Sequence, residues 1–119
     1  MANHPSESFP PEVRIVRSSE YRSLYKAGKK IHSVSFILFW RENRKGHHRL
    51  GLTVSRKVGN AVIRNRVKRL FREIFRKARH EIPGHFDLLV NAKSGCGSVD
   101  YLDAEREFLA AAHRISQSG

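Results

Sequence analysis

The sequence contains a single cysteine, Cys96, among 119 residues. One cysteine excludes a disulfide within the chain, and it excludes a zinc site built from several cysteines. Its surroundings, "SGCGS", are typical of a glycine-rich turn and supply no neighbouring base. The sequence therefore favours a bystander residue over a reactive thiol at this position.

Long apolar runs are also missing. No run approaches the roughly 20 apolar residues that a membrane-spanning helix needs. The N-terminal residues are polar and include acids, which is not typical of a signal peptide. We therefore expect a cytoplasmic protein that has no membrane partner.

Acidic residues are scarce in the middle of the chain. Overall, 23 Lys and Arg stand against 11 Asp and Glu, for a formal net charge of +12. Residues 41–79 hold 14 of these cations but only two acids, Glu42 and Glu73. This density is typical of nucleic-acid binding, with an anionic membrane as the second choice. The scarcity of acids argues against an autonomous nuclease, because such enzymes hold two metal ions about 4 Å apart with clustered carboxylates.

The stretch "AVIRNRVKRLFREIFRKAR", residues 61–79, combines this charge with a helical period. Its apolar residues recur at steps of three and four, which predicts a buried stripe made of Ile63, Val67, Leu70, Phe71, Ile74 and Ala78. The opposite side carries Asn65, Lys68, Arg69, Arg72 and Arg76, while Arg64 and Arg66 flank the stripe. Glu73 is expected to pair chiefly with Lys77 and Arg69. The other cations repel one another unless a polyanion faces them.

The rest of the chain predicts one domain. Residues 1–13 are expected to be a flexible or extended lead-in, and residues 14–119 an α/β domain. A first helix, capped by Ser18 or Ser19, should end at Ala27 before Gly28. Strands are predicted at 33–40, 49–55 and 86–92, with a polar loop around His47 and His48 between the first two. Asn60 is the predicted N-cap of the basic helix. A last helix starts near Asp100, and its predicted buried stripe is Tyr101, Ala104, Phe108, Ala112 and Ile115.

Residues 49–76, "RLGLTVSRKVGNAVIRNRVKRLFREIFR", resemble the protein subunit of bacterial ribonuclease P. The similarity extends to "FPPEVRIVRSSEYRSLYKAG" and "FDLLVNAK", so it spans nearly the whole chain. The resemblance implies an α+β fold, a single small α/β sandwich around a mostly antiparallel four-stranded sheet, in the order helix, strands, basic helix, strand, helix. It also implies a left-handed β-α-β crossover, against the usual preference for right-handed connections.

The resemblance implies a protein that assists a catalytic RNA in the magnesium-dependent removal of the 5′ leader from precursor tRNA. Its partners would be that RNA and precursor tRNA, with no protein partner required. Magnesium would belong to the RNA, and the chain would carry no catalytic residue, metal site or cofactor. The implied RNA-binding residues are Arg56, Lys57, Asn60, Arg64, Asn65, Arg66, Lys68, Arg69 and Arg72.

A leader-binding cleft is implied between the basic helix and one sheet face, lined by Tyr21, Tyr25 and Phe39. Aromatic rings suit this role because unpaired bases stack on them. From the residues alone, the two tyrosines are better explained as the edge of the core, and the same holds more strongly for Phe39. Two other functions stay open, an autonomous nuclease and a general nucleic-acid module, since major-groove readers also use arginine and asparagine on a helix.

Overall fold

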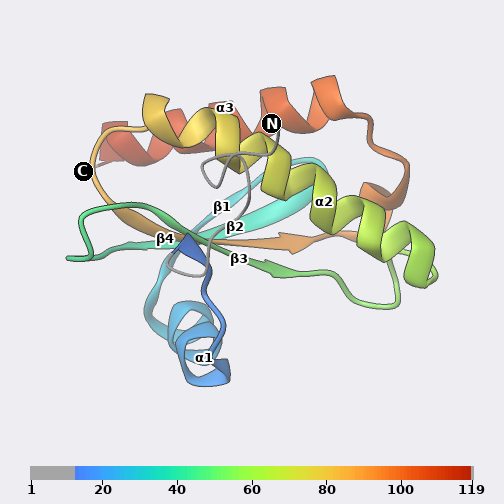
Figure 1. The fold of residues 1–119 in the computed structure, drawn as a ribbon, viewed down its shortest axis with the longest axis horizontal. Coiled ribbons are helices and arrows are strands. Elements are labelled where there is room, and N and C mark those ends of the chain that lie inside the picture. Colours follow the sequence, from blue (N-terminus) through green and yellow to red (C-terminus); the bar gives the residue numbers. More distant parts are fainter. Residues whose placement is uncertain (1–12, 119) are drawn as a thin grey trace, which may run out of the picture.

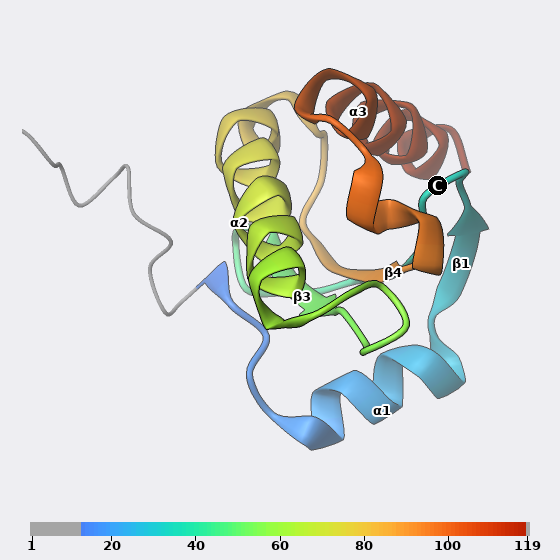
Figure 2. The same ribbon diagram turned by 90° about the vertical axis from the view of Figure 1, so that its right-hand side faces the viewer.

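The computed structural model describes residues 13–118, which form a four-stranded sheet between two layers of helices (Figures 1 and 2). Helices α2 and α3 cover one face of the sheet and α1 lies on the other. The elements are α1 (Ser18–Ala27), β1 (Lys29–His32), β2 (Phe36–Glu42), β3 (Arg49–Thr53), α2 (Ala61–Ala78), η3 (Arg79–Glu81), β4 (Phe86–Ala92), η4 (Ser94–Ser98) and α3 (Tyr101–Ser118). Within the described residues, no helix is both long and apolar enough to span a membrane.

The strand order in the sheet is β1-β2-β4-β3. The pairs β1-β2 and β2-β4 are antiparallel, whereas β3 runs parallel to β4 and the two are connected through α2. The predicted α+β class and the mostly antiparallel four-stranded sheet are therefore confirmed. The left-handed sense of the β3-α2-β4 crossover stays a prediction.

The first part of the sheet differs from the sequence prediction. The strand expected at residues 33–40 begins only at Phe36, and a short strand that was not predicted, β1, precedes it. Ser33 starts the turn between them, where its N–H donates to the Phe36 carbonyl at 2.8 Å. Because β1 is an edge strand with the sequence "KKIH" and only Ile31 buried, its residues lack the apolar alternation that identifies a strand.

The lead-in predicted at residues 1–13 lies almost entirely outside the described residues. Val13 is the exception, and it is 3% exposed and part of the core. The predicted N-cap of α1 was wrong, because the N-cap is Arg17, which makes no side-chain capping bond. Strand β3 ends at Thr53, two residues before the predicted end.

The main core lies between the sheet and the α2-α3 layer. Helix α2 buries Val67, Phe71, Ile74, Phe75 and Ala78. Phe75 was not part of the predicted stripe, while the predicted Ile63 and Leu70 are only partly buried. Helix α2 packs against α3 as well as against the sheet, so it buries a wider surface than the predicted stripe. The predicted stripe of α3 is buried except for Tyr101, which is half-buried.

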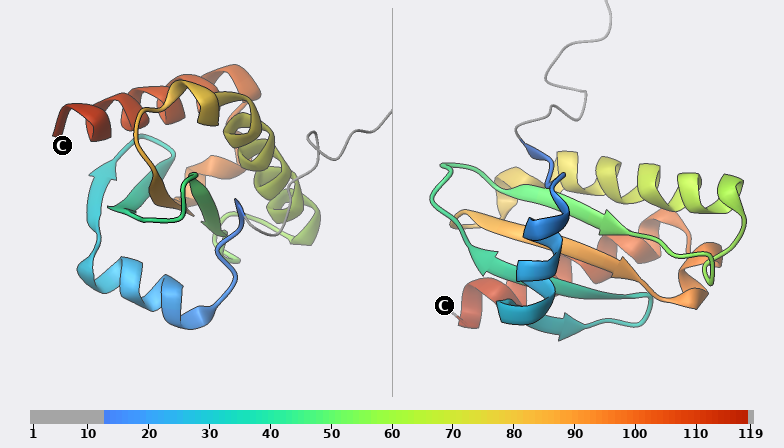
Figure 3. Two further views of the ribbon diagram at one scale, coloured as in Figure 1. Left: turned by 60° about the vertical axis from the view of Figure 1, so that its left-hand side comes forward. Right: turned by 90° about the horizontal axis from the view of Figure 1, so that it is seen from below.

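A second, smaller apolar cluster lies on the α1 face and consists of Ile15, Leu24, Phe39 and Leu89. Seen from this side, α1 crosses the strands toward one end (right panel of Figure 3). The other half of the face is not covered by any described helix. The two sides of the sheet are thus filled to different extents.

Candidate nucleic-acid interface

The N-terminus of α2 brings together backbone donors and cationic side chains. The Asn60 side chain accepts a hydrogen bond from the Ile63 N–H at 3.0 Å, which confirms the predicted N-cap. The first turn contains no acidic residue. A helix N-terminus carries partial positive charge, so the arginines that follow add to an anion-attracting field.

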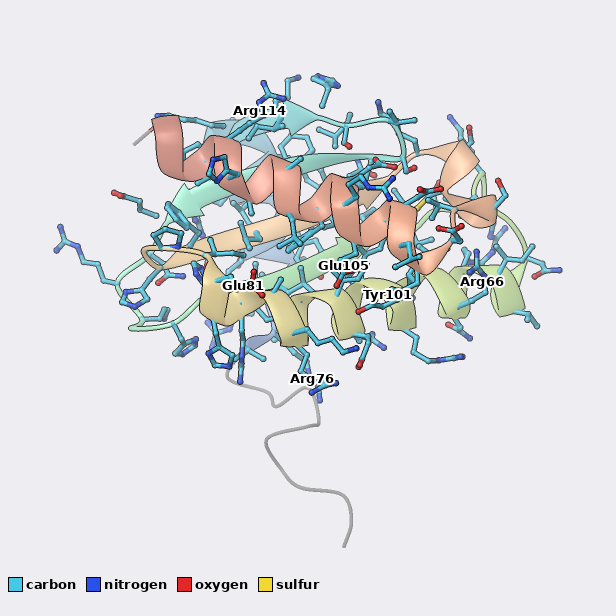
Figure 4. The ribbon with its side chains drawn as sticks, turned by 90° about the horizontal axis from the view of Figure 1, so that it is seen from above. Arg66, Arg76, Glu81, Tyr101, Glu105 and Arg114 are labelled. Atoms are coloured by element: carbon cyan, nitrogen blue, oxygen red, sulfur yellow. The ribbon has the colours of Figure 1, made fainter. Side chains whose placement is uncertain are left out.

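Arg64 and Arg66 are half-buried and bonded to backbone carbonyls. Arg64 Nη1 donates to the Gly59 carbonyl at 2.8 Å, and Arg66 Nη2 donates to the Gly97 carbonyl at 2.6 Å. Figure 4 shows Arg66 at the end of α2 that begins the helix. A guanidinium has five N–H donors, so each arginine keeps donors for a ligand. These contacts with distant loops were not predicted, because no local sequence pattern indicates them.

The other predicted RNA-binding residues lie on the loop before α2 and along its outer surface. Among the described residues, no acid forms an ion pair with Lys68 or Arg69. Glu73 pairs with Arg76 at 2.6 Å and with Lys77 at 3.7 Å, so the predicted pairing with Arg69 was wrong. Hydrogen bonds from Arg76 lower the pKa of Glu73. The exposed members of the predicted set are Arg56, Lys57, Asn60, Asn65, Arg69 and Arg72, and Lys68 is half-buried.

A hollow of about 310 Å³ lies at the edge of the sheet beside β3. Lys68 and Arg72 of α2 line it together with Tyr21 of α1. The remaining lining residues are Arg14, Ile15, Val16, Leu50 and Leu52. The hollow therefore connects the basic helix on one side of the sheet with an aromatic ring on the other.

Tyr21 is held against β3 by its hydroxyl group. The Leu52 N–H donates to the hydroxyl oxygen at 3.2 Å, and the ring lies over Gly51. A Cβ at Gly51 would come within 3.1 Å of the tyrosine ring, so the small residue makes this close approach possible. Tyr21 is consequently both a structural residue and part of the wall of the hollow.

Tyr25 and Phe39 form an edge-to-face pair with ring centroids 4.7 Å apart. The Tyr25 hydroxyl donates to Thr53 Oγ1 at 2.8 Å, which fixes the ring above the sheet. Tyr25 is 38% exposed and Phe39 is 8% exposed. Tyr25 therefore offers a surface for stacking, and Phe39 mainly supports it.

The predicted cleft needs a correction in its location. The space between α2 and its own sheet face is filled by core residues such as Phe71 and Leu88, so a ligand has no room there. The aromatic pair lies on the opposite face, beside α1. The basic helix and the aromatic face meet only around the edge of β3.

The open half of the α1 face includes residues that were not predicted. Alternation along β2 and β4 places Ile37 and Asn91 on this face, and both are half-buried. Lys30 and His32 of β1 lie on the same face and are exposed. The period of two that places Phe39 on this face could have identified Ile37 as well.

A buried ion pair fixes α1 to the sheet at the covered end. Arg49 donates to both oxygens of Asp87, at 2.8 and 2.9 Å, and also to Glu20 of α1 at 3.0 Å. Asn43 donates to the same carboxylate at 2.8 Å. Burial alone would raise the pKa of Asp87, which is 1% exposed, but the hydrogen bonds from Arg49 and Asn43 outweigh it and lower the pKa.

The described residues contain no group of three or more His, Cys, Asp or Glu side chains placed to hold a metal ion. Cys96 is fully buried, and burial raises its pKa to about 11. The thiol is therefore protonated near neutral pH, which agrees with a bystander residue.

The family model described as Ribonuclease P matches residues 9–116. The Ribonuclease P protein component of Geotalea uraniireducens (strain Rf4) is 39% identical over 110 residues, which cover 91% of this chain and 95% of the relative. The solved RNase P protein from Thermotoga maritima aligns with a TM-score of 0.78 at 31% identity, covering 85% of this chain and 96% of that one. The solved RNase P protein from Staphylococcus aureus aligns with a TM-score of 0.77 at 29% identity, covering 87% of this chain and 94% of that one. From its sequence and its fold alike, this chain belongs to the bacterial ribonuclease P protein family.

Proposed function

We propose that the chain is the protein subunit of a ribonuclease P ribonucleoprotein, and that it binds both the catalytic RNA and the 5′ leader of precursor tRNA. The names of its relatives support a role in tRNA 5′ processing with an RNA subunit. The observation that carries the proposal is the surface of α2, where Lys68 and Arg69 have no acidic partner within the described residues. Only a polyanion balances such a surface over its length.

The two RNA contacts fall on different parts of the molecule. The beginning and outer side of α2 would bind backbone phosphates of the catalytic RNA, because arginine forks donate two hydrogen bonds to one phosphate. The open half of the α1 face would bind the single-stranded leader, with Tyr25 stacking on an unpaired base. The hollow at the edge of β3 lies between these two surfaces, so a strand following it would touch both Lys68 and Tyr21.

The chemistry would belong to the RNA, with magnesium bound there. The described carboxylates do not fit a magnesium site, because no three of them are placed together and several are engaged in structural contacts. Asp87 is held by Arg49, and Glu73 pairs with Arg76. Glu107 accepts hydrogen bonds from Ser33 and from the N–H and hydroxyl of Ser35. The chain would therefore position RNA and neutralise its charge, and it would contribute no catalytic residue.

A cleavage assay tests this function. Precursor tRNA is incubated at low magnesium concentration with the chain alone, with the catalytic RNA alone, and with both. We expect cleavage only from the pair, because the protein supplies the cationic contacts that magnesium replaces at higher concentration. Cleavage by the chain alone would instead identify an autonomous nuclease.

The same assay separates the proposal from a general nucleic-acid module. A general module would bind the RNAs without restoring cleavage at low magnesium. Arg69→Ala serves as the internal check, because its side chain is exposed and makes no ion pair with a described residue. This variant should need more magnesium for the same rate, while its fold remains intact.

A further inference from the structure

A second hollow, of about 440 Å³, lies at the opposite end of α2 from Arg64 and Arg66. Its size falls within the range of roughly 300 to 1,000 Å³ that is typical of small-ligand sites. It lies between the β2-β3 loop and the loop that joins η3 to β4, which are on the same side of the molecule in Figure 1. The described residues of the lining include four of the seven histidines of the chain and no acid: Val13, Gly46, His47, His48, Arg79, His80, Ile82, Gly84 and His85.

Arg79 lines this hollow and has an unsatisfied donor. Its Nε atom is buried, and no group among the described residues accepts a hydrogen bond from it. Buried polar atoms in proteins are nearly always bonded, so an unpaired nitrogen on a guanidinium group that lines a cavity points to a missing acceptor. The acceptor that suits a guanidinium best is an oxyanion.

His48 forms the floor of the hollow and is neutral. The Phe86 N–H donates to its Nδ1 at 3.0 Å, so the proton must be on Nε2, which donates to the Ile82 carbonyl at 2.9 Å. The ring stacks on Phe86 and is 5% exposed. Burial lowers its pKa, which is consistent with this neutral form.

The other three histidines have ring nitrogens available to a ligand. His47 uses Nδ1 to donate to the His48 carbonyl at 3.1 Å, which leaves Nε2 unused. His80 and His85 are exposed, and no side-chain hydrogen bond joins either ring to a described residue. Each unused ring nitrogen can form a hydrogen bond with a ligand.

The surrounding charges also favour an anion. Arg44 and Lys45 are exposed on the β2-β3 loop. The acids nearest in sequence are Glu12, which lies outside the described residues, Glu81 of η3, and Asp87 of β4, whose carboxylate is paired with Arg49. Glu81 lines a different hollow with His113 and Arg114, and in Figure 4 it lies on the α3 side of the end of α2. Two glycines with positive φ, Gly46 at 83° and Gly84 at 81°, shape the rim.

We propose that this hollow binds a phosphate group, with Arg79 as the cation and the rings of His47, His80 and His85 as hydrogen-bonding partners. The site is separate from the proposed RNA surface at the start of α2, since an 18-residue helix is about 27 Å long.

The test uses the isolated chain labelled with ¹⁵N, observed through the ring signals of its histidines. Inorganic phosphate is titrated at fixed pH and at an ionic strength held constant with chloride. We expect saturable shifts of the ring signals of His47, His80 and His85. A second titration uses a five-nucleotide uridine RNA without terminal phosphates. Shifts of the same rings by this RNA would assign the site to backbone phosphate, and shifts by inorganic phosphate alone would assign it to a free phosphate.

Arg79→Gln is the decisive variant, with Arg106→Gln as the matched control. Both remove one positive charge, but Arg106 is exposed on α3 and pairs only with Asp103 among the described residues. We expect Arg79→Gln to weaken phosphate binding roughly tenfold or more, as the loss of a charged hydrogen bond predicts. Fluorescence of the single tryptophan, Trp40, checks that both variants are folded.

Two results would overturn the proposal: no saturable shift with either ligand, or equal phosphate binding by the Arg79→Gln and Arg106→Gln variants. Neither of these results depends on tRNA cleavage, so failure here would leave the proposed function untouched. His85→Gln provides an independent reading, because the residue is exposed and its substitution does not alter the core. It should weaken phosphate binding by less than Arg79→Gln does, because the cation of the site is retained.

Discussion

The two faces of the sheet are stabilised in different ways. The face under α2 and α3 is filled with apolar side chains, among them Phe36, Phe71 and Phe108, all fully buried. The face under α1 has a smaller apolar cluster and relies on the buried ion pair between Arg49 and Asp87. This ion pair, which Arg49 extends to Glu20, attaches α1 to one end of the face. The other end can therefore stay open to a ligand without weakening the main core.

The largest effect that would test this contrast is expected from Asp87→Ala. Removing the carboxylate leaves the Arg49 guanidinium buried without its main partner, which typically costs about 3 to 5 kcal/mol. Urea unfolding followed by Trp40 fluorescence measures the loss. The matched variant on the other face is Phe71→Ala, for which a similar cost of about 3 to 5 kcal/mol is expected from the cavity alone.

The pH dependence of the free energy of unfolding should distinguish Asp87→Ala from Phe71→Ala. The folded pKa of Asp87 is lowered, so its contribution to stability is present above the unfolded pKa of about 3.9 and is lost as the pH falls toward the folded pKa. Asp87→Ala should thus lose less stability on acidification than the parent chain, and Phe71→Ala should lose as much as the parent. If all three proteins lost the same stability on acidification, the ion pair between Arg49 and Asp87 would not stabilise the fold.

The next effect concerns the open half of the α1 face. Tyr25→Ala should weaken binding of precursor tRNA to the assembled ribonucleoprotein by about 1 to 3 kcal/mol, the usual contribution of one stacked base. Mature tRNA, which lacks the leader, should bind as before. The measurement is a pair of dissociation constants with calcium replacing magnesium to suppress cleavage.

Tyr25→Phe is the control for this residue. It keeps the ring and its contact with Phe39 but loses the hydrogen bond to Thr53. The variant should discriminate precursor from mature tRNA nearly as well as the parent chain. If Tyr25→Ala weakened both RNAs equally, the ring would be a packing residue and this face would not bind the leader.

A smaller effect separates two arginines of α2. Arg69→Ala should reduce the slope of log affinity against log salt by about 0.7 to 0.9, the share of one phosphate contact, with little change in stability. Arg66→Ala should reduce the slope similarly and also destabilise the fold, because the Gly97 carbonyl loses its donor. Binding isotherms for the catalytic RNA at several salt concentrations, together with urea unfolding, provide both quantities. If the slope of log affinity against log salt were unchanged in both variants, the RNA would not contact this surface of α2.

The smallest effect is expected from Glu73→Gln. Its ion pairs with Arg76 and Lys77 are partly exposed, and such pairs contribute at most about 1 kcal/mol. The loss of one negative charge should strengthen RNA binding slightly at low salt, and the gain should vanish at high salt because exposed charges are screened. A large loss of stability in this variant would contradict the view that the outer side of α2 has little structural role.

Much of this arrangement could be predicted from periodicity, because burial repeats regularly along helices and strands. The spacing of Val67, Phe71 and Ile74 identified the buried side of α2, and the preference of asparagine for the N-cap position located the Asn60 cap correctly. Strand β1 was missed because an edge strand needs only one buried residue, Ile31. Local patterns describe neighbours along the chain, so they indicate an element but not the elements that pack against it.

The contacts between segments that are distant in the chain could not be predicted from the sequence. Asp87 was not recognised as an ion-pair partner of Arg49, which is 38 residues away. His48 was assigned to a polar loop but is buried, because two backbone groups from the segment around β4 satisfy its ring. The location of the aromatic pair relative to α2 depends on which face each helix covers, and periodicity is the same for both faces.

The hydroxyl of Tyr21 has a consequence for how the chain behaves at high concentration. Strand β3 is the last strand of the sheet, and an outer strand with unpaired backbone groups is a template for pairing with another molecule. The Leu52 N–H is bonded to Tyr21, and the Leu50 carbonyl accepts from the Ile15 N–H, so two of the groups along this edge are already occupied. Tyr21, at the wall of the hollow that we propose binds RNA, thus also helps to protect the free protein against edge-to-edge association.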